Sequence, residues 1–390
     1  MTTPSTIRRR LKAAAALVLS ALVAPTLAAC SNTAQAGTDQ ASDTVNLGVL
    51  YPKTGDYAEY GALFEQGIDL AVEKVNATGG VQGKLLGVKY FDTQSDPKQD
   101  AAVAPKLVAD PSIIAVIGDY SSPASKAASP AFQQAGLVHY GFNNSAPDFV
   151  STGDHVWSPA YGTDNIMPVW AQGVADSGAK KISVVYIEND WGAGAYGYFE
   201  AAAKKLGLDI VYQSAYPATD TDDYSPILIK ARDAKPDATV QLGYGEGAQI
   251  VNTLRDTLGY TGPFFGGQNT PEFLSVSGKN GYGTVTDGIF TADDDKALIQ
   301  QFVKDFRAKY NTDPGDFNLT AYQAVIDLAY GVNKTSATRE GVQQALQTVT
   351  DFPSYVGKSD TFQFDQATRR VKDPQPILLV DKDGKFVRLG

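Results

Sequence analysis

Small polar residues follow one apolar segment of the sequence in a pattern that favours anion binding. Ser121 and Ser122 lie in the loop that follows the apolar run 113–118, and Pro123 stands where a helix would begin, with Ser122 as its N-cap. Hydroxyls and free N–H groups at a helix start attract a carboxylate or a similar acceptor, by roughly 0.3–1 kcal/mol from the helix dipole alone. A plain helix cap without any ligand is an equally good interpretation of these residues.

Polar and aromatic residues also follow other strand-like segments. The loop after the segment 137–140 carries Asn143 and Ser145. Ligands of open α/β sheets bind beyond the carboxyl ends of the strands, so we expect a binding site at these loops. One aromatic residue in such a loop usually belongs to the core or the rim, whereas several at equivalent positions favour a ligand site. The aromatic residues in question are Trp191, after the segment 181–187, and Tyr244, after the segment 238–242.

Motifs for catalysis, metals and nucleotides are weak in this chain. The run 192–197 matches GxGxxG, but Gln213 and Ser214 stand where a dinucleotide site has an acidic residue. His139 and His155 are the only histidines and lack metal-ligand spacing, and neither a GxSxG nor a phosphate-binding loop occurs. We therefore predict no catalytic residue, no metal and no cofactor, and we keep a secreted enzyme only as the less favoured alternative.

The N-terminus predicts export. Four basic residues between positions 8 and 12 precede an apolar stretch, 13–24, that is shorter than a membrane span. Small residues then precede Cys30, which resembles a bacterial lipobox and implies that residues 1–29 are a signal peptide and that Cys30 is lipidated. An ordinary signal peptide with an accidental cysteine is the alternative. We expect an exported protein that a lipid anchors to the outer face of the cell membrane.

Composition bounds the partners and the number of lobes. The formal net charge of −10 and the lack of a basic stripe exclude nucleic-acid binding. Cys30 is the only cysteine, so no disulfide forms within the chain. Residues 30–44 are polar and predict a flexible tether. About 345 residues remain, which is too many for one typical core and enough for two lobes.

Strand-like and helix-like segments alternate along the remaining chain, which predicts parallel sheets covered by helices. The tail is strand-like, with a hairpin turn at Asp383-Gly384. The predicted strands are 45–50, 88–91, 113–117, 137–140, 181–187, 208–212, 238–242, 264–266 and segments of 361–389. The predicted helices are 59–76, one that begins at Pro97 with Asp96 as N-cap, 193–206, 248–258, 294–310, 317–333 and 338–349.

Five segments carry a family resemblance: 48–55 (GVLYPKTG), 59–61 (EYG), 69–80, 91–97 (FDTQSDP) and 117–122 (IGDYSS). In order and spacing they resemble the type I periplasmic binding proteins of the leucine/isoleucine/valine class. The resemblance implies an α/β fold of two Rossmann-like lobes with parallel sheets, joined by a three-crossover hinge that closes on a ligand. The implied lobes are 45–160 with 292–358, and 161–291 with 359–390.

The resemblance also implies a ligand site built from both lobes. The residues implied to hold the ligand's carboxylate or an equivalent acceptor are Ser121, Ser122, Asn143 and Ser145. Tyr60 lines the pocket, Phe317 lies beside the ligand's side chain, and the second lobe contributes Trp191 and Tyr244. Gln268 stands where amino-acid binders of this class have an acid for the ligand's ammonium.

Gln268 leaves the ligand class open. A desolvated ammonium without a carboxylate partner is costly, and an amide supplies no charge. Glu246 or Asp119 could compensate, although a helix-start charge or a solvated loop explains each more simply. We expect a branched-chain or other amino acid that is delivered to ABC permease subunits. The alternatives are a neutral amide, an amine-free aromatic acid, or a sensor that presents its ligand to a signalling partner.

Overall fold

The structure is a computed structural model that describes residues 44–217 and 223–390. The predicted signal peptide, the tether up to residue 43 and Cys30 lie outside the described residues, so these expectations stay predictions. Within the two described ranges, no helix is both long enough and apolar enough to cross a bilayer.

Five parallel strands form the first sheet, in the order β2-β1-β3-β4-β5. β3 is its central strand, and all five residues of this apolar strand are buried, as expected for a strand covered on both faces. Because the strands are parallel, the loops that follow β3 and β4 lie at the same edge of the sheet. The strands are β1 (Thr44–Tyr51), β2 (Leu85–Asp92), β3 (Ile113–Ile117), β4 (Val138–Tyr140) and β5 (Val156–Trp157).

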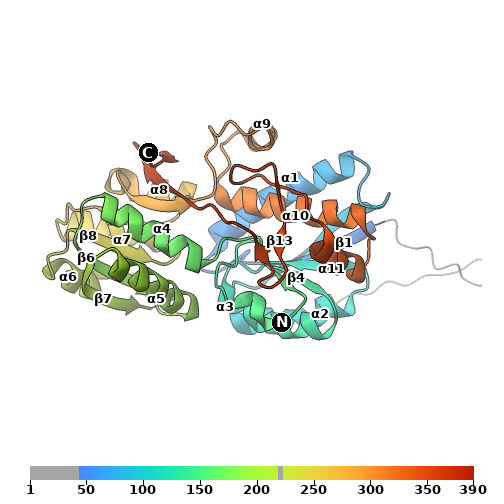
Figure 1. The fold of residues 1–390 in the computed structure, drawn as a ribbon, viewed down its shortest axis with the longest axis horizontal. Coiled ribbons are helices and arrows are strands. Elements are labelled where there is room, and N and C mark those ends of the chain that lie inside the picture. The colour runs from blue at the N-terminus through green and yellow to red at the C-terminus, as the bar shows by residue number, and fades with distance from the viewer. Residues whose placement is uncertain (1–43, 218–222) are drawn as a thin grey trace, which may run out of the picture. The chain divides into compact units, whose positions relative to one another are not determined.

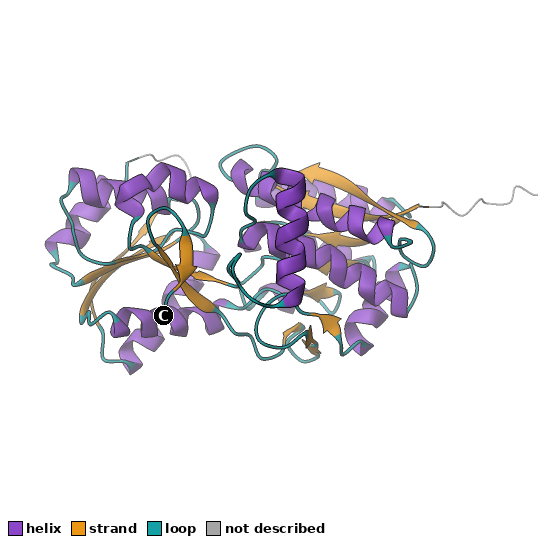
Figure 2. Ribbon diagram, turned by 90° about the horizontal axis from the view of Figure 1, so that it is seen from above, coloured by secondary structure: helices purple, strands orange, loops and turns teal. Residues whose placement is uncertain are grey.

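Helices flank both faces of this sheet (Figure 2). Asp96 caps α2 as predicted, because its side chain accepts hydrogen bonds from the N–H groups of Lys98 and Gln99. α10 comes much later in the sequence but packs along α1, and the Asn318 side chain donates to the Leu63 carbonyl at 2.8 Å. The helices are α1 (Ala58–Ala77), α2 (Pro97–Ala109), α3 (Ser122–Gln134), α9 (Ala297–Tyr310), α10 (Asp316–Lys334) and α11 (Arg339–Thr348).

The second sheet has seven strands in the order β16-β15-β10-β9-β8-β6-β7, of which β15 and β16 run antiparallel to their neighbours. Asp383 and Gly384 both have positive φ between β15 and β16, which confirms the predicted hairpin turn. The strands are β6 (Lys181–Ile187), β7 (Asp209–Tyr216), β8 (Ala238–Leu242), β9 (Phe264–Phe265), β10 (Val285–Gly288), β15 (Ile377–Asp381) and β16 (Phe386–Arg388). The helices are α4 (Thr163–Asp176), α5 (Asp190–Lys205), α6 (Ser225–Asp233), α7 (Gly247–Asn252) and α8 (Pro271–Ser277).

The chain passes between the two sheets three times: after β5, after β10, and before β15. We call the first sheet with its helices the N-terminal lobe and the second sheet with its helices the C-terminal lobe. Figure 1 shows α1 and α10 beside the first sheet, and α4 and α5 beside the second. The predicted α/β fold of two lobes joined by three crossovers is confirmed.

The segment before the last crossing contacts the N-terminal lobe. Phe364 lies edge-on to Trp157, with ring centroids 5.4 Å apart, and the Arg370 side chain donates to the Asn144 carbonyl at 3.2 Å. The predicted lobe boundaries stay a prediction, and these contacts favour assigning residues 359–371 to the N-terminal lobe. This segment forms two small hairpins with its neighbours: β11 (Phe352–Pro353) with β12 (Thr361–Phe362), and β13 (Phe364–Asp365) with β14 (Arg370–Val371).

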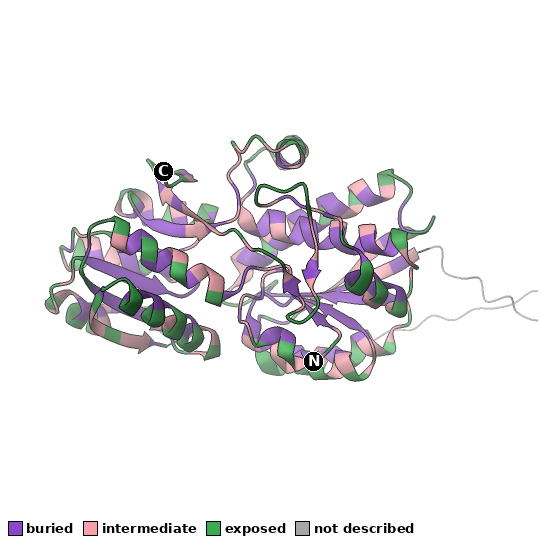
Figure 3. Cartoon of the chain, viewed as in Figure 1, coloured by how far each residue is buried: buried purple, intermediate pink, exposed green. Residues whose placement is uncertain are grey.

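Most predicted elements are present, and three helices differ clearly from their predicted bounds. α9 begins at Ala297, three residues later than predicted. α5 begins at Asp190, three residues early, because the Asn189 side chain caps its first turn. The predicted helix 248–258 is divided, since α7 ends at Asn252 and a π-helical turn, Thr253–Thr257, follows it. Figure 3 shows buried residues along the strands and on the helix faces that cover them. The elements without a predicted counterpart include β5, β10, α4, α6 and α8.

Candidate ligand-binding site

Loops at the carboxyl ends of both sheets surround a cavity of about 140 Å³. The N-terminal lobe contributes the loop after β4 and the start of α10, and the C-terminal lobe contributes the start of α5 and the loop after β9. The cavity therefore lies between groups from the two lobes. Of the predicted ligand residues, those that line it are Asn143, Ser145, Trp191, Gln268 and Phe317.

The two predicted serines differ in their roles. Ser121, and not Ser122, is the N-cap of α3, because its extended backbone ends at the helix start and its Oγ accepts the Ala124 N–H at 3.3 Å. Proline fits either of the first two helical positions, so Pro123 did not fix the cap to one residue. Ser122 is the first helical residue, and its Oγ faces the Ala146 N–H at 3.5 Å. Both serines are buried beside the loop after β4.

A hydrogen bond joins the two lobes at the cavity. Trp191 donates from Nε1 to Ser145 Oγ at 2.8 Å, which connects the start of α5 to the loop after β4. Trp191 has this position because α5 begins at Asp190. The GxGxxG run 192–197 consequently lies within α5 and forms no phosphate-binding loop. Gly192 is required there for packing, since a Cβ would collide with the Ile187 carbonyl oxygen.

Aromatic rings from both lobes pack together next to the cavity. Tyr60 stacks on Tyr120, with centroids 4.2 Å apart and 11° between the ring planes. Tyr244 meets Tyr120 at 5.3 Å and Tyr57 at 5.5 Å, both edge-on. Aromatic pairs of this kind contribute about 0.5–1.5 kcal/mol each beyond their buried area. We call the following residues the aromatic cluster: Tyr57, Tyr60, Phe64, Tyr120, Phe142, Trp191, Tyr244 and Phe317.

The aromatic cluster changes the interpretation of two predicted residues. Tyr60 and Tyr244 are both buried in the cluster and do not line the cavity, whereas Trp191 and Phe317 belong to both. Tyr120, which the sequence did not single out, links the lobes, because its hydroxyl donates to Gln268 Oε1 at 3.1 Å. The Gln268 carbonyl oxygen therefore already accepts a hydrogen bond.

Neither acid that was considered as a substitute for a charge at position 268 lines the cavity. Asp119 is fully buried and accepts hydrogen bonds from the hydroxyls of Thr93 and Ser95, which explains it as a structural residue. Glu246 accepts the Tyr244 N–H at 2.8 Å, and burial raises its pKa to about 7.

Two other carboxylates, Asp287 and Asp316, do line the cavity and were missed. Asp287 lies on β10, which the sequence did not predict, and its Oδ1 accepts the Trp170 Nε1–H at 3.1 Å. Asp316 is the first residue of α10, directly before the predicted Phe317. The available signal was an acid at the start of a helix, which elsewhere is usually a simple first-turn charge.

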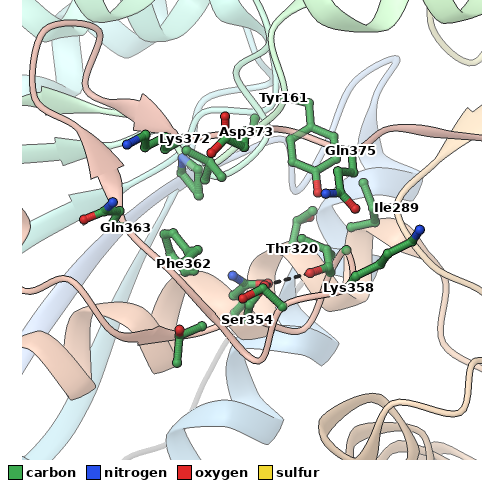
Figure 4. A pocket seen from close by; sticks show the side chains of 18 of the residues that line it. Tyr161, Ile289, Thr320, Ser354, Lys358, Phe362, Gln363, Lys372, Asp373 and Gln375 are labelled. Atoms are coloured by element: carbon green, nitrogen blue, oxygen red, sulfur yellow. Dashed lines mark hydrogen bonds between the residues drawn. The ribbon is translucent and has the colours of Figure 1, made fainter.

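A second, larger cavity of about 400 Å³ lies on the hinge side and contains none of the predicted residues. Tyr161 and Thr320 line both cavities, together with Phe142, Ala160 and Ile289. Figure 4 shows its side chains around a central space, with Tyr161 and Gln375 on one side and Phe362 and Gln363 on the other. The walls come from all three crossings and from the chain around residues 354–375, and we call it the hinge-side cavity.

The periplasmic binding protein family model matches residues 44–385, so the chain belongs to this family. It is 28% identical over 318 residues to the leucine-, isoleucine-, valine-, threonine- and alanine-binding protein of Pseudomonas aeruginosa, covering 80% of this chain and 84% of that protein. It is 26% identical over 373 residues to Leu/Ile/Val-binding protein homolog 7 of Brucella abortus, covering 90% and 93%.

Solved structures show the same fold. The branched-chain amino acid transporter substrate-binding protein of Streptococcus pneumoniae, in complex with isoleucine, has a TM-score of 0.80 at 24% identity, covering 89% of this chain and 100% of that chain. A solute-binding protein of R. palustris, in complex with 4-hydroxybenzoate, has a TM-score of 0.79 at 19% identity, covering 89% and 95%. The protein is thus an exported periplasmic binding protein and not an enzyme, and it has the type I fold of the leucine/isoleucine/valine class.

Proposed function

We propose that this protein captures an amino acid, foremost a branched-chain one, between its lobes and delivers it to ABC permease subunits. The observation that carries the proposal is the 140 Å³ cavity, whose walls come from both lobes and include hydroxyl, amide and carboxylate groups beside Trp191 and Phe317. A cavity of this volume suits a ligand smaller than the drug-sized molecules that fill sites of about 300–1,000 Å³. The names of the curated relatives support an amino acid.

The contacts between the lobes suggest how the two lobes close on the ligand. In our proposal the ligand's carboxylate binds the Asn143 amide and the Ser145 hydroxyl first, and the lobe that carries Trp191 and Tyr244 then closes over it. Because Trp191 donates a hydrogen bond to Ser145, the closing lobe brings Trp191 next to the ligand's carboxylate and shields it from water. Excluding water strengthens the remaining hydrogen bonds, and the ligand selects the closed state by binding it better.

An amine-free aromatic acid is the second candidate ligand. The uncharged Gln268, whose oxygen is taken by Tyr120, and the aromatic rings around the cavity favour it. The relative from R. palustris is a structural neighbour in complex with such an acid. A neutral amide and a sensing role in place of import are further alternatives from the sequence.

A thermal-shift screen of amino acids, amides and aromatic acids, followed by calorimetry of those that bind, tests the ligand class. A ligand that binds only the folded protein raises the unfolding free energy by about 2.7 kcal/mol at 100 times its Kd. We expect branched-chain amino acids to raise the melting temperature. If no compound of the three classes does so, the proposal of a small-molecule receptor is wrong.

We also propose that lipid on Cys30 holds the protein at the outer face of the membrane. The support is the lipobox-like sequence and the exported family. Metabolic labelling with a fatty acid in a bacterial host should label the wild-type protein and not Cys30→Ser, which should be released in soluble form. Equal labelling or equal membrane retention of both proteins would contradict the anchor.

A further inference from the structure

In the part of the chain that the structure describes, the cavity between the lobes is lined by acidic side chains and by no basic ones. Asp287 and Asp316 both line it, and among the described residues that line it there is no lysine, arginine or histidine. Tyr161 is the remaining titratable group in its wall. Two carboxylates facing one enclosed space repel each other, and a bound cation would relieve that repulsion.

One oxygen of Asp316 accepts a hydrogen bond from Ile289, and the other makes none of standard geometry, although the Asn269 side chain and the Phe290 N–H lie close enough to lower the pKa of this carboxyl. Its Oδ2 accepts the Ile289 N–H at 3.2 Å, while its Oδ1 is buried and accepts no hydrogen bond of normal length. A buried acceptor without a donor destabilises the folded protein, and more so if it is charged. Asp316 also lies against Gly288, because Oδ2 is 3.2 Å from the position that a Cβ on Gly288 would occupy.

Asp316 also adjoins the loop of Gln268, although the two residues belong to different lobes. The Asn269 carbonyl oxygen lies 3.3 Å from the position that a Cβ on Gly315 would occupy, so the start of α10 contacts the loop after β9. An ammonium near Gln268 therefore has a carboxylate within the same cavity, supplied by the facing helix.

We propose that Asp316, assisted by Asp287, binds the ammonium group of the ligand. This inference rests on the proposed function and narrows it to ligands that carry an amine, so that amine-free acids are disfavoured. The ligand's carboxylate lies toward Asn143 and Ser145, and its ammonium lies toward the first turn of α10. Gln268 then contributes its amide and no charge.

The protonation of the two acids gives a second signature. Burial, followed by the nearby Asp287, raises the pKa of Asp316 well above its usual range, and burial raises the pKa of Asp287. A cation favours the ionised forms, so binding releases protons, and the affinity falls as the pH falls through the raised pKa values.

A purely structural role for Asp316 makes a different prediction. An acid in the first turn of α10 stabilises the helix dipole, and its bond to Ile289 orders the second crossing. Loss of these contacts would lower stability and would weaken every ligand equally. The presence or absence of the ligand's amine therefore separates recognition from structure.

The experiment measures two ligand series on three proteins by calorimetry: wild type, Asp316→Asn and Asp327→Asn. The ligands are L-leucine, L-valine and L-alanine, and the 2-hydroxy acids in which a hydroxyl replaces each amine. We expect Asp316→Asn to weaken the amino acids by about 30-fold or more and the hydroxy acids by less than about threefold. Asp327 is the matched control, because it is a buried acid of α10 that binds the Tyr140 hydroxyl and does not line the cavity.

The outcomes separate this inference from the proposed function. Equal binding of amino acids to wild type and Asp316→Asn would overturn the role of Asp316 and leave an amino-acid receptor intact. Equal weakening of both series would do the same and assign Asp316 a structural role. If wild type binds the hydroxy acids or aromatic acids and no amino acid, the amino-acid function itself fails. Proton release on amino-acid binding, measured in buffers of different ionisation enthalpy, should decrease in Asp316→Asn and not in Asp327→Asn.

Discussion

The two cavities beside the hinge differ in volume and in chemistry. Volume favours the larger cavity as the ligand site, whereas chemistry favours the smaller one. The hinge-side cavity holds about 400 Å³ and the cavity between the lobes about 140 Å³. The larger one has exposed Lys358 and Lys372 at its walls, whereas the smaller one holds two half-buried acids and a hydrogen bond from one lobe to the other. A binding protein depends on groups that converge when the lobes close, so chemistry and not volume identifies the smaller cavity as the ligand site.

Replacing Trp191 with alanine should produce the largest change. Trp191 lines the smaller cavity, bonds Ser145 and packs on Tyr244 at 5.1 Å. We expect ligand affinity to fall by about 30-fold or more, as for other aromatic anchors, with little change in melting temperature because the residue is only partly buried. Calorimetry measures the loss, and Trp191→Phe should recover part of it. Unchanged affinity would reject the site.

The pH dependence of stability should come from acids where the two lobes meet and not from residues of the hinge-side cavity. Burial and then the neighbouring Glu272 raise the pKa of Glu59 from 4.5 to about 8, and burial raises that of Glu246 to about 7. The folded protein therefore holds these protons more tightly than the unfolded chain, so the free energy of unfolding decreases as the pH rises from about 4.5 to about 8. Melting curves across this range should show a shallower decline for Glu59→Gln. Lys358→Gln, at the hinge-side cavity, should keep the wild-type slope, and identical slopes for all three proteins would contradict this assignment.

Tyr120→Phe tests how much a single hydrogen bond between the lobes contributes to ligand affinity. The variant keeps the stacking on Tyr60 and removes the bond to Gln268 that joins the lobes. A hydrogen bond of this kind contributes about 0.5–1.5 kcal/mol, so affinity should fall by about twofold to tenfold. Tyr90→Phe is the matched control, because the Tyr90 hydroxyl binds Asp69 outside the cavity wall. Equal affinities for both variants would show that the Tyr120 bond does not contribute to closure.

Filling the hinge-side cavity should have the smallest effect. Gln363 lines this cavity and not the smaller one, so Gln363→Trp reduces its volume without touching the proposed site. We expect the affinity for the ligand of the smaller cavity to stay within about twofold of wild type. Calorimetry with the same ligand measures it. A large loss would mean that the hinge-side cavity takes part in ligand binding or in lobe movement.

The predictions from sequence succeeded where neighbouring residues decide the outcome. The continuous apolar run 113–117 is a buried strand, Asp96 caps α2, and Asp383-Gly384 forms the hairpin turn. The cap of α3 was placed one residue late, because Pro123 fits two positions of a helix start. Periodicity and capping depend on residues a few positions apart, so both can be recognised from the sequence alone.

The site was predicted only in part, for a physical reason. Strand-end loops pointed to Asn143, Ser145 and Trp191, because parallel strands bring their carboxyl ends to one edge. Asp316 was missed because an acid at a helix start has an ordinary explanation in sequence. Asp287 was missed because β10, a strand of four residues, was not predicted.

The sequence by itself determined the order of elements, the family and the loops at which a ligand could bind, because these depend on short-range patterns and on the order of motifs. The tertiary structure alone decided which of these loops meet. Tyr120 and Gln268 are 148 positions apart and share a hydrogen bond, and Asp316 reaches the same cavity from a helix of the other lobe. Contacts of this range follow from the packing of two lobes around three crossings, and no local pattern contains them.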